Sequence, residues 1–158
     1  MKSVVLVAAG VLAGFGVGVH QAQEPEVVSL NHVAISVDDY DEAVAFYSET
    51  LGFPVAFQFD ESDGFAMSYL QINRNTFIEI IPSSPERPAG FVHIGLEVSD
   101  AAALVDRLAE SGIETREPGV SPRTGTTIGL ARAPDGTGIE LLEFGPESLH
   151  RSVMDAWR

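Results

Sequence analysis

A chain of 158 residues, 45% hydrophobic and 20% charged, is long enough for one domain with its own core and has the composition of a globular protein. Its formal net charge of −14 and its single lysine, Lys2, argue against nucleic acid or an anionic membrane surface as a partner, because both attract basic patches. The absence of cysteine excludes disulfide bonds, a thiolate nucleophile and a cysteine-ligated zinc site.

Residues 1–23 have the pattern of a secretory signal peptide. Lys2 supplies a positive charge, residues 4–19 form an apolar run diluted by glycine, and Ala22 ends a plausible cleavage site. We therefore expect an exported protein, periplasmic or extracellular, with no membrane segment after cleavage. The alternative is an uncleaved N-terminal anchor, although the apolar run is shorter than the roughly 20 residues that a membrane span needs.

The next part of the chain predicts a strand, a helix and three more strands. We expect the first strand at 29–37 and a helix that Asp38 or Asp39 caps and Gly52 ends. One face of this helix would carry Tyr40, Val44, Tyr47 and Leu51. The further strands are expected at 55–59, 65–72 and 76–81.

After a proline- and serine-rich linker at 82–90, the same order of elements repeats. A strand at 91–98 leads to a helix capped by Ser99 or Asp100. The apolar face of this helix would carry Ala101, Leu104, Val105 and Leu108. Strands are expected at 113–116, 126–133 and 139–144, with a glycine- and proline-rich loop at 118–125.

The repeated order βαβββ predicts an α+β domain made of two equivalent modules. We place the domain at 27–145, with module 1 at about 29–81 and module 2 at about 91–144. Residues 146–158 form a C-terminal helical tail, in which Leu149, Val153 and Trp157 are spaced for one apolar face. That face would dock on the domain or on a second subunit.

Two histidines and two glutamates occupy equivalent positions in the two halves. His32 and His93 lie near the start of each module's first strand, 61 residues apart, and Glu79 and Glu140 have the same separation. Each glutamate lies in a run of isoleucine and leucine, where burying a lone carboxylate is costly. Taken singly, such a histidine is commonly structural and such a glutamate can face solvent. Their shared register instead indicates that the four side chains converge on a metal ion.

Mixed imidazole and carboxylate ligands suit several divalent metals. Nickel, cobalt, iron, manganese and zinc all remain open, because geometry and availability decide among them. Four protein ligands on a six-coordinate ion would leave positions for water or substrate, as catalytic sites do. We therefore expect a divalent metal cofactor and a small-molecule substrate.

Four segments of the chain carry a family resemblance: NHVA (31–34), FYSETLGF (46–53), VHIGLEV (92–98) and APDGTGIEL (133–141). Together they resemble the vicinal oxygen chelate superfamily, which includes glyoxalase (lactoylglutathione lyase), methylmalonyl-CoA epimerase, extradiol dioxygenases and bleomycin-resistance-like binding proteins. The resemblance covers residues 29–144. It implies that the two modules form a pair of half-barrels around a shared metal site.

The resemblance also implies roles for individual residues. The family's metal positions fall on His32, Glu79, His93 and Glu140, a set typical of its glyoxalase-like lyases. The implied activity is that of a metal-dependent lyase or isomerase, which chelates a pair of substrate oxygens and stabilises an enediolate or enolate. The resemblance assigns the proton transfer to Glu140, with Glu79 as the second candidate.

Two other functions stay open at this point. An Fe(II) extradiol-type dioxygenase would need only three of the four ligands, and a non-catalytic, exported small-molecule-binding or resistance protein would need none. Arg123, in the loop at 118–125, is the candidate for binding an anionic substrate group, and a solvated surface arginine is the ordinary alternative. The resemblance further implies a homodimer, with the modules paired within one chain or exchanged between chains.

Overall fold

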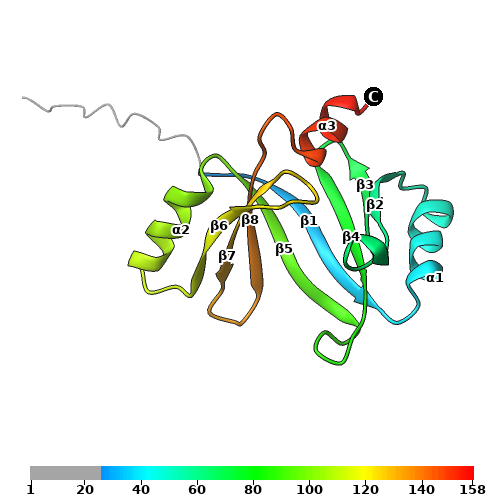
Figure 1. Cartoon of the computed structure of the whole chain (residues 1–158), viewed down its shortest axis with the longest axis horizontal. Coiled ribbons are helices and arrows are strands. Elements are labelled where there is room, and N and C mark those ends of the chain that lie inside the picture. Colours follow the sequence, from blue (N-terminus) through cyan, green and yellow to red (C-terminus); the bar gives the residue numbers. More distant parts are fainter. Residues whose placement is uncertain (1–25) are drawn as a thin grey trace, which may run out of the picture.

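A computed structural model describes residues 26–158 as one mixed sheet of eight strands with three α-helices outside it (Figure 1). The predicted signal peptide and its export therefore concern residues outside the described part. The strand order is β2-β3-β4-β1-β5-β8-β7-β6. This mixed sheet and its helices confirm the expected α+β class. Within residues 26–158, no helix is long and apolar enough to cross a membrane.

The first half contributes four strands to one side of the sheet: β1 (Val27–Val37), β2 (Val55–Phe59), β3 (Met67–Asn73) and β4 (Thr76–Pro82). Its helix α1 (Tyr40–Ala45) continues as a π-helical segment, η1 (Phe46–Thr50), and a short 3₁₀ helix, η2 (Glu61–Asp63), precedes β3. The expected strand at 65–72 begins two residues later, at Met67.

The second half contributes the other four strands: β5 (Gly90–Val98), β6 (Thr115–Val120), β7 (Thr127–Arg132) and β8 (Gly138–Glu143). Helix α2 (Ala101–Glu110) packs against β6, β7 and β8. The expected strand at 113–116 runs further, to Val120, and shortens the following loop. This extension is possible because β6 is an edge strand with an irregular register between Arg116 and Gly119, which accommodates Pro118.

The two halves meet at the centre of the sheet. Strands β1 and β5 pair antiparallel, and each pairs on its other side with the last strand of its own half, β4 or β8, in parallel. The strand order is therefore symmetric about the β1–β5 pair, as Figure 1 shows. Aspartates begin both main helices, with Asp39 accepting from the Glu42 amide and Asp100 from the Ala103 amide.

The C-terminal helix α3 (Leu149–Ala156) packs on the first half of the sheet. Its buried residues are His150 and Met154, and Met154 joins a core cluster with Tyr69 and Phe77. The buried face is thus displaced by one residue from the predicted stripe, of which Val153 is partly buried and Trp157 is 37% exposed. The tail therefore docks on its own domain.

A glycine lies at a tight contact between the two halves. Gly95 of β5 pairs with His32 of β1, and a Cβ atom at position 95 would lie 2.1 Å from His32 Cε1. His32 is fully buried, so its ring has no room to move aside. The packing of the central strands therefore requires that residue 95 has no side chain.

We predict that Gly95→Ala destabilises the protein by about 1–3 kcal/mol, the usual cost of overpacking a buried site. Thermal unfolding followed by circular dichroism measures this as a lower Tm. Gly119→Ala is the matched control, because a Cβ at that strand position meets no atom within 4 Å. Equal Tm values for the two variants would contradict the proposed packing.

Candidate metal centre

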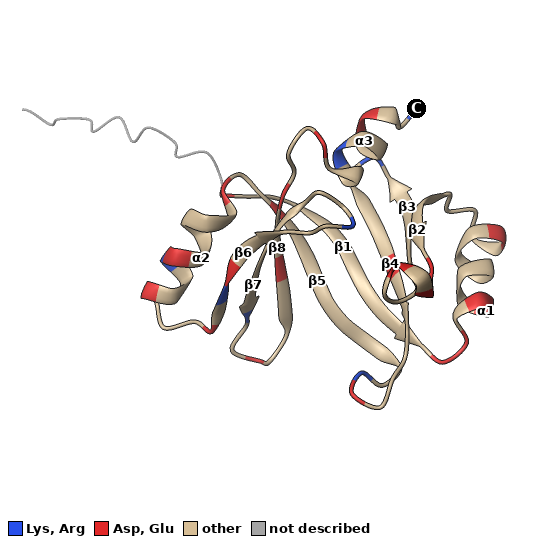
Figure 2. Cartoon of the chain, in the orientation of Figure 1, with Lys and Arg blue, Asp and Glu red and all other residues tan. Residues whose placement is uncertain are grey.

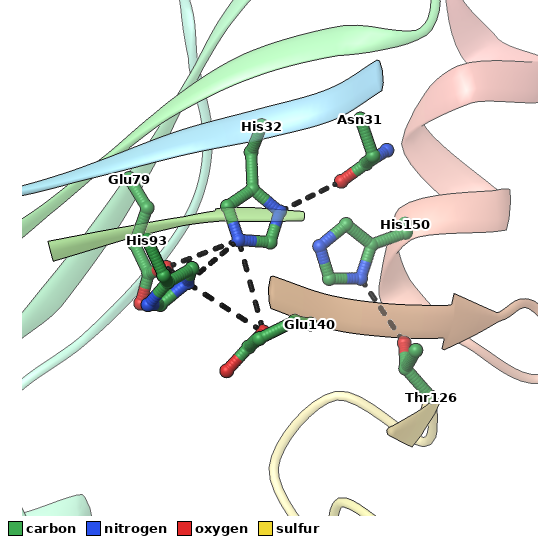
Figure 3. Close-up of polar contacts among 7 residues, drawn as sticks. All are labelled: Asn31, His32, Glu79, His93, Thr126, Glu140 and His150. Atoms are coloured by element: carbon green, nitrogen blue, oxygen red, sulfur yellow. Dashed lines mark hydrogen bonds and ion pairs between the residues drawn. The ribbon is translucent and has the colours of Figure 1, made fainter. Parts of the chain in front are cut away.

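The four predicted ligand residues come from the four central strands. His32 lies on β1, Glu79 on β4, His93 on β5 and Glu140 on β8, and Figure 3 shows their polar ends meeting at one point. The register explains why. His32 and Glu140 both pair with Gly95, whereas Glu79 and His93 both pair with Ala34. Cross-strand partners point to the same face of a sheet, so all four side chains reach its concave side.

The donor atoms lie within one coordination sphere. The Nε2 atoms of His32 and His93 are 3.0 Å apart. Oε2 of Glu79 is 3.4 Å from His32 Nε2 and 3.2 Å from His93 Nε2. Oε2 of Glu140 is 3.7 Å from each of the same two nitrogens. Ligands bound at about 2.1 Å to one ion lie roughly 3.0–3.4 Å from their neighbours. The separations among His32, His93 and Glu79 fit this range, and Glu140 lies slightly farther out.

A buried carboxylate oxygen gives the second test of this fit. Oε2 of Glu79 is shielded from solvent and accepts no hydrogen bond within the described structure. A bound cation would satisfy it, because buried polar atoms without a partner are costly. Ligand atoms of His32, His93 and Glu140 all lie within 4.8 Å of one another, and Glu79 approaches the histidine pair from the opposite side, on β4.

Asn31 sets the orientation and tautomer of His32. Its Nδ2 donates to the backbone carbonyl of Asn75 at 3.3 Å, so its Oδ1 is the atom that faces His32 Nδ1 at 3.0 Å. Because Oδ1 can only accept, Nδ1 of His32 carries the hydrogen. Nε2 therefore keeps its lone pair and aims it into the site, which is the form a metal ligand needs.

Burial and neighbouring charges shift the pKa values of the two histidines in opposite directions. Burial lowers the pKa of His32 to about 4, against the effect of Glu79 and together with that of His93. Burial also acts to lower the pKa of His93, but the carboxylates of Glu79 and Glu140 outweigh it and raise that pKa. His32 is therefore neutral at pH 7, the state in which it binds a metal.

The pKa values of the two glutamates are also shifted in opposite directions. Burial acts to raise the pKa of Glu79, but the contacts and charges of His93 and His32 outweigh it, so that pKa is lowered. Burial raises the pKa of Glu140, assisted by the charge of Glu79 and opposed by those of His93 and Arg116. Glu79 is therefore held ionised, whereas Glu140 is the more basic carboxylate.

A cleft of about 430 Å³ opens onto the site in the second half. Its walls include His93 and Glu140, and the side chain of Glu140 is 22% exposed, compared with 6% for Glu79. The register explains the asymmetry. Phe77 pairs with His32, whereas the equivalent partner of His93 is Gly138, which lines the cleft.

The same replacement of large by small residues occurs one strand further out. Tyr69 pairs with Glu79, and Leu130 is the equivalent partner of Glu140. Tyr69 is buried, and His150 of α3 packs edge-on against it at 4.9 Å between ring centroids. In the first half the concave face is therefore filled with aromatic side chains, and in the second half it is open to a ligand.

Arg123 does not line this cleft. Its guanidinium lies 4.3 Å and 4.4 Å from the ring centroids of Phe59 and Phe65, and it donates to the Phe65 carbonyl at 2.8 Å. The loop after β6 is thus fastened to the loop before β3 in the other half. A substrate-binding role for Arg123 stays a prediction, and the position itself indicates a contact between modules.

Three residues next to the site, Asn31, Arg116 and His150, were not identified from the sequence. Comparing the two modules does not reveal them, because they have no polar equivalent in the other module. The counterpart of Asn31 in the second half is Val92, and that of Arg116 is Val55. His150 belongs to the tail, which has no counterpart. Its ring stacks 6.5 Å from that of His32 and its Nδ1 lies 3.1 Å from Thr126 Oγ1 (Figure 3). The adjacency of Asn31 to His32 was the one available signal.

We predict that Asn31→Leu weakens zinc binding about 10–100-fold, because His32 loses the acceptor that fixes its tautomer. Competition with a chromogenic chelator measures the affinity, and circular dichroism verifies folding. Asn31→Asp keeps an acceptor at the same place and should stay within a few-fold of the unmodified protein. An unchanged affinity in Asn31→Leu would show that Asn31 does not orient the ligand.

Comparison with known proteins agrees with this geometry. Residues 29–141 match the family model of the Glyoxalase/Bleomycin resistance protein/Dioxygenase superfamily. The chain is 34% identical over 123 residues to the Bacillus subtilis protein YwkD, covering 73% of this chain and 96% of that one. It is 41% identical over 95 residues to an ethylmalonyl-CoA/methylmalonyl-CoA epimerase of Cereibacter sphaeroides, covering 52% of this chain and 70% of the epimerase.

Longer and structurally known relatives complete the comparison. Identity to the lactoylglutathione lyase GLX1 of Arabidopsis thaliana is 29% over 124 residues, covering 73% of this chain and 44% of that enzyme, so the chain spans less than half of its length. The fold matches that of methylmalonyl-CoA epimerase from Mycobacterium tuberculosis with a TM-score of 0.66 at 24% identity, covering 80% of this chain and 95% of that one. The chain thus belongs to the Glyoxalase/Bleomycin resistance protein/Dioxygenase superfamily, also called the vicinal oxygen chelate superfamily.

Proposed function

We propose that the protein is a metal-dependent lyase or isomerase that moves a proton on a carbon next to a substrate carbonyl. The observation that carries the proposal is the meeting of two imidazoles and two carboxylates at the inner end of an open cleft. Relatives named lactoylglutathione lyase and methylmalonyl-CoA epimerase support this reaction class.

The residues divide the work between holding the ion and moving the proton. His32, His93 and Glu79 would hold a divalent ion; nickel, cobalt, iron, manganese and zinc all suit this donor set. The ion would supply positive charge beside the substrate oxygens, where negative charge develops as the proton leaves. Glu79 suits the ligand role because it is buried and its pKa is lowered.

Glu140 is the proposed proton carrier. It is the only one of the two glutamates that lines the cleft, so a substrate there would meet its carboxylate. Burial raises its pKa, which brings it nearer to the working pH and makes it a stronger base. The apolar walls formed by Val92, Leu130 and Ile139 would limit the access of water to the exchanging proton.

We predict that Glu140→Gln lowers the rate of carbon–proton exchange at least about 100-fold per bound metal, the usual contribution of a general base. The assay is NMR detection of deuterium uptake from D₂O by α-ketoaldehyde–thiol adducts and acyl thioesters, with each candidate metal added. Glu110→Gln, on the exposed end of α2, is the charge-matched control.

The outcomes separate the base from the ligand. Loss of exchange with metal still bound supports Glu140 as the base, and full exchange in metal-loaded Glu140→Gln transfers that role to Glu79 or rejects it. A protein that takes up no metal under any reconstitution would leave the non-catalytic binding function in place of an enzyme.

A dioxygenase is the second candidate, and one observation favours it. The mutually close set of His32, His93 and Glu140 is a two-histidine, one-carboxylate arrangement, which suits non-haem Fe(II). Oxygen uptake with catechols that needs Fe(II) and survives Glu79→Gln would establish this function. Loss of all activity in Glu79→Gln favours the lyase or isomerase, in which Glu79 helps to hold the ion.

Export and a homodimer belong to the same proposal. Export is supported by the sequence of residues 1–23, and it would favour a substrate that needs no cytosolic thiol. A dimer is supported by the family alone. Immunoblotting of cell fractions and light scattering of the purified protein test the two expectations.

A further inference from the structure

Arg116 lines the same cleft as Glu140, the proposed base. Arg116 of β6 pairs with Leu130 of β7, and Leu130 pairs with Glu140 of β8. These three side chains therefore form one cross-strand row on the concave face, and all three line the cleft. Figure 2 shows basic positions on β6 and β7 beside an acidic position on β8.

The two arginines of the cleft are not equivalent. Arg132 is engaged, because its guanidinium lies 3.4 Å from the Glu114 carboxylate and donates to the Gly136 carbonyl at 3.1 Å. Arg116 forms no ion pair with any residue in the described range 26–158, although it lies on the cleft wall. A free guanidinium in a strongly acidic protein offers an anion a site that the surrounding surface does not.

The distances set the size of the ligand. Glu140 and Arg116 are two strands apart, which is roughly 10 Å between their backbones. A cleft of about 430 Å³ holds a compact molecule. Val92, Leu130 and Ile139 contribute apolar surface to the cleft, which Glu114, Thr115 and Arg132 also line. A ligand that fits would have polar groups at both ends and a short hydrocarbon middle.

We propose that Arg116 selects a substrate carboxylate, so that the substrate is a small oxygenated acid. Its oxygen pair would lie at the metal site and its carboxylate against Arg116, with a few carbon atoms between them. A planar guanidinium binds a carboxylate through two parallel hydrogen bonds, which also fixes the direction of the ligand in the cleft. This inference rests on the proposed metal site and names the class of molecule that the site takes.

The test uses ligands that differ only in the anionic end. Monohydroxamates of glutaric and adipic acid present a metal-chelating oxygen pair and a distant carboxylate, and neutral hydroxamates of the same chain lengths lack the carboxylate. Isothermal titration of the zinc-loaded protein should show at least about tenfold tighter binding of one acidic hydroxamate, the size expected for a charge-assisted hydrogen bond. Arg116→Gln should reduce that preference to less than about threefold and leave the neutral ligand's affinity unchanged.

Two variants control for charge alone. Arg107→Gln, on α2 and paired with Glu26, makes the same charge change outside the cleft and should keep the preference. Arg132→Gln should keep it as well, because that arginine is already engaged. Equal binding of acidic and neutral hydroxamates, or a preference that follows Arg132, overturns the role of Arg116. Failure of every hydroxamate to bind, with zinc or without, instead rejects the metal site on which the inference depends.

Discussion

The structure depends on the clustering of two imidazoles and two carboxylates between its central strands. Glu79 and His32 are almost entirely shielded from water, and a carboxylate in that position needs compensating positive charge. Protonated His93, whose pKa is raised, is one source of this charge, and a bound divalent ion would be the other. The duplicated strand order brings these groups together, because it places each histidine beside the glutamate of its own half and all four on one face.

The site is symmetric in its ligands and asymmetric in its surroundings. Phe77 and Tyr69 fill the first half, where their equivalents in the second half are Gly138 and Leu130. Helix α3 then covers the first half, adding Met154 to its core. Two glutamates at equivalent positions thereby acquire different exposure and oppositely shifted pKa values, which is the condition for one to serve as a ligand and the other as a base.

Much of the fold could be predicted from the sequence because the same pattern occurs twice. The capping aspartates Asp39 and Asp100 and the equal spacing of His32 and His93 were visible as repeats. What could not be predicted was the departure from symmetry. Asn31 and Arg116 have apolar counterparts, and the structure places them beside the site through the hydrogen bond between Asn31 and His32 and the cross-strand register of Arg116. The buried face of α3 is displaced by one residue from the predicted face. His150 is buried because it contacts Thr126 and packs against aromatic rings, and a polar residue gives no sign of this in the sequence.

The most direct test of the central claim is anomalous X-ray scattering from crystals grown with zinc. The structure predicts one strong peak at about 2.0–2.2 Å from Nε2 of His32 and His93 and from a carboxylate oxygen of Glu79 or Glu140. A peak elsewhere, or no peak from crystals grown with excess zinc, would contradict the account, because the four side chains would then lie together for a reason other than a shared ion.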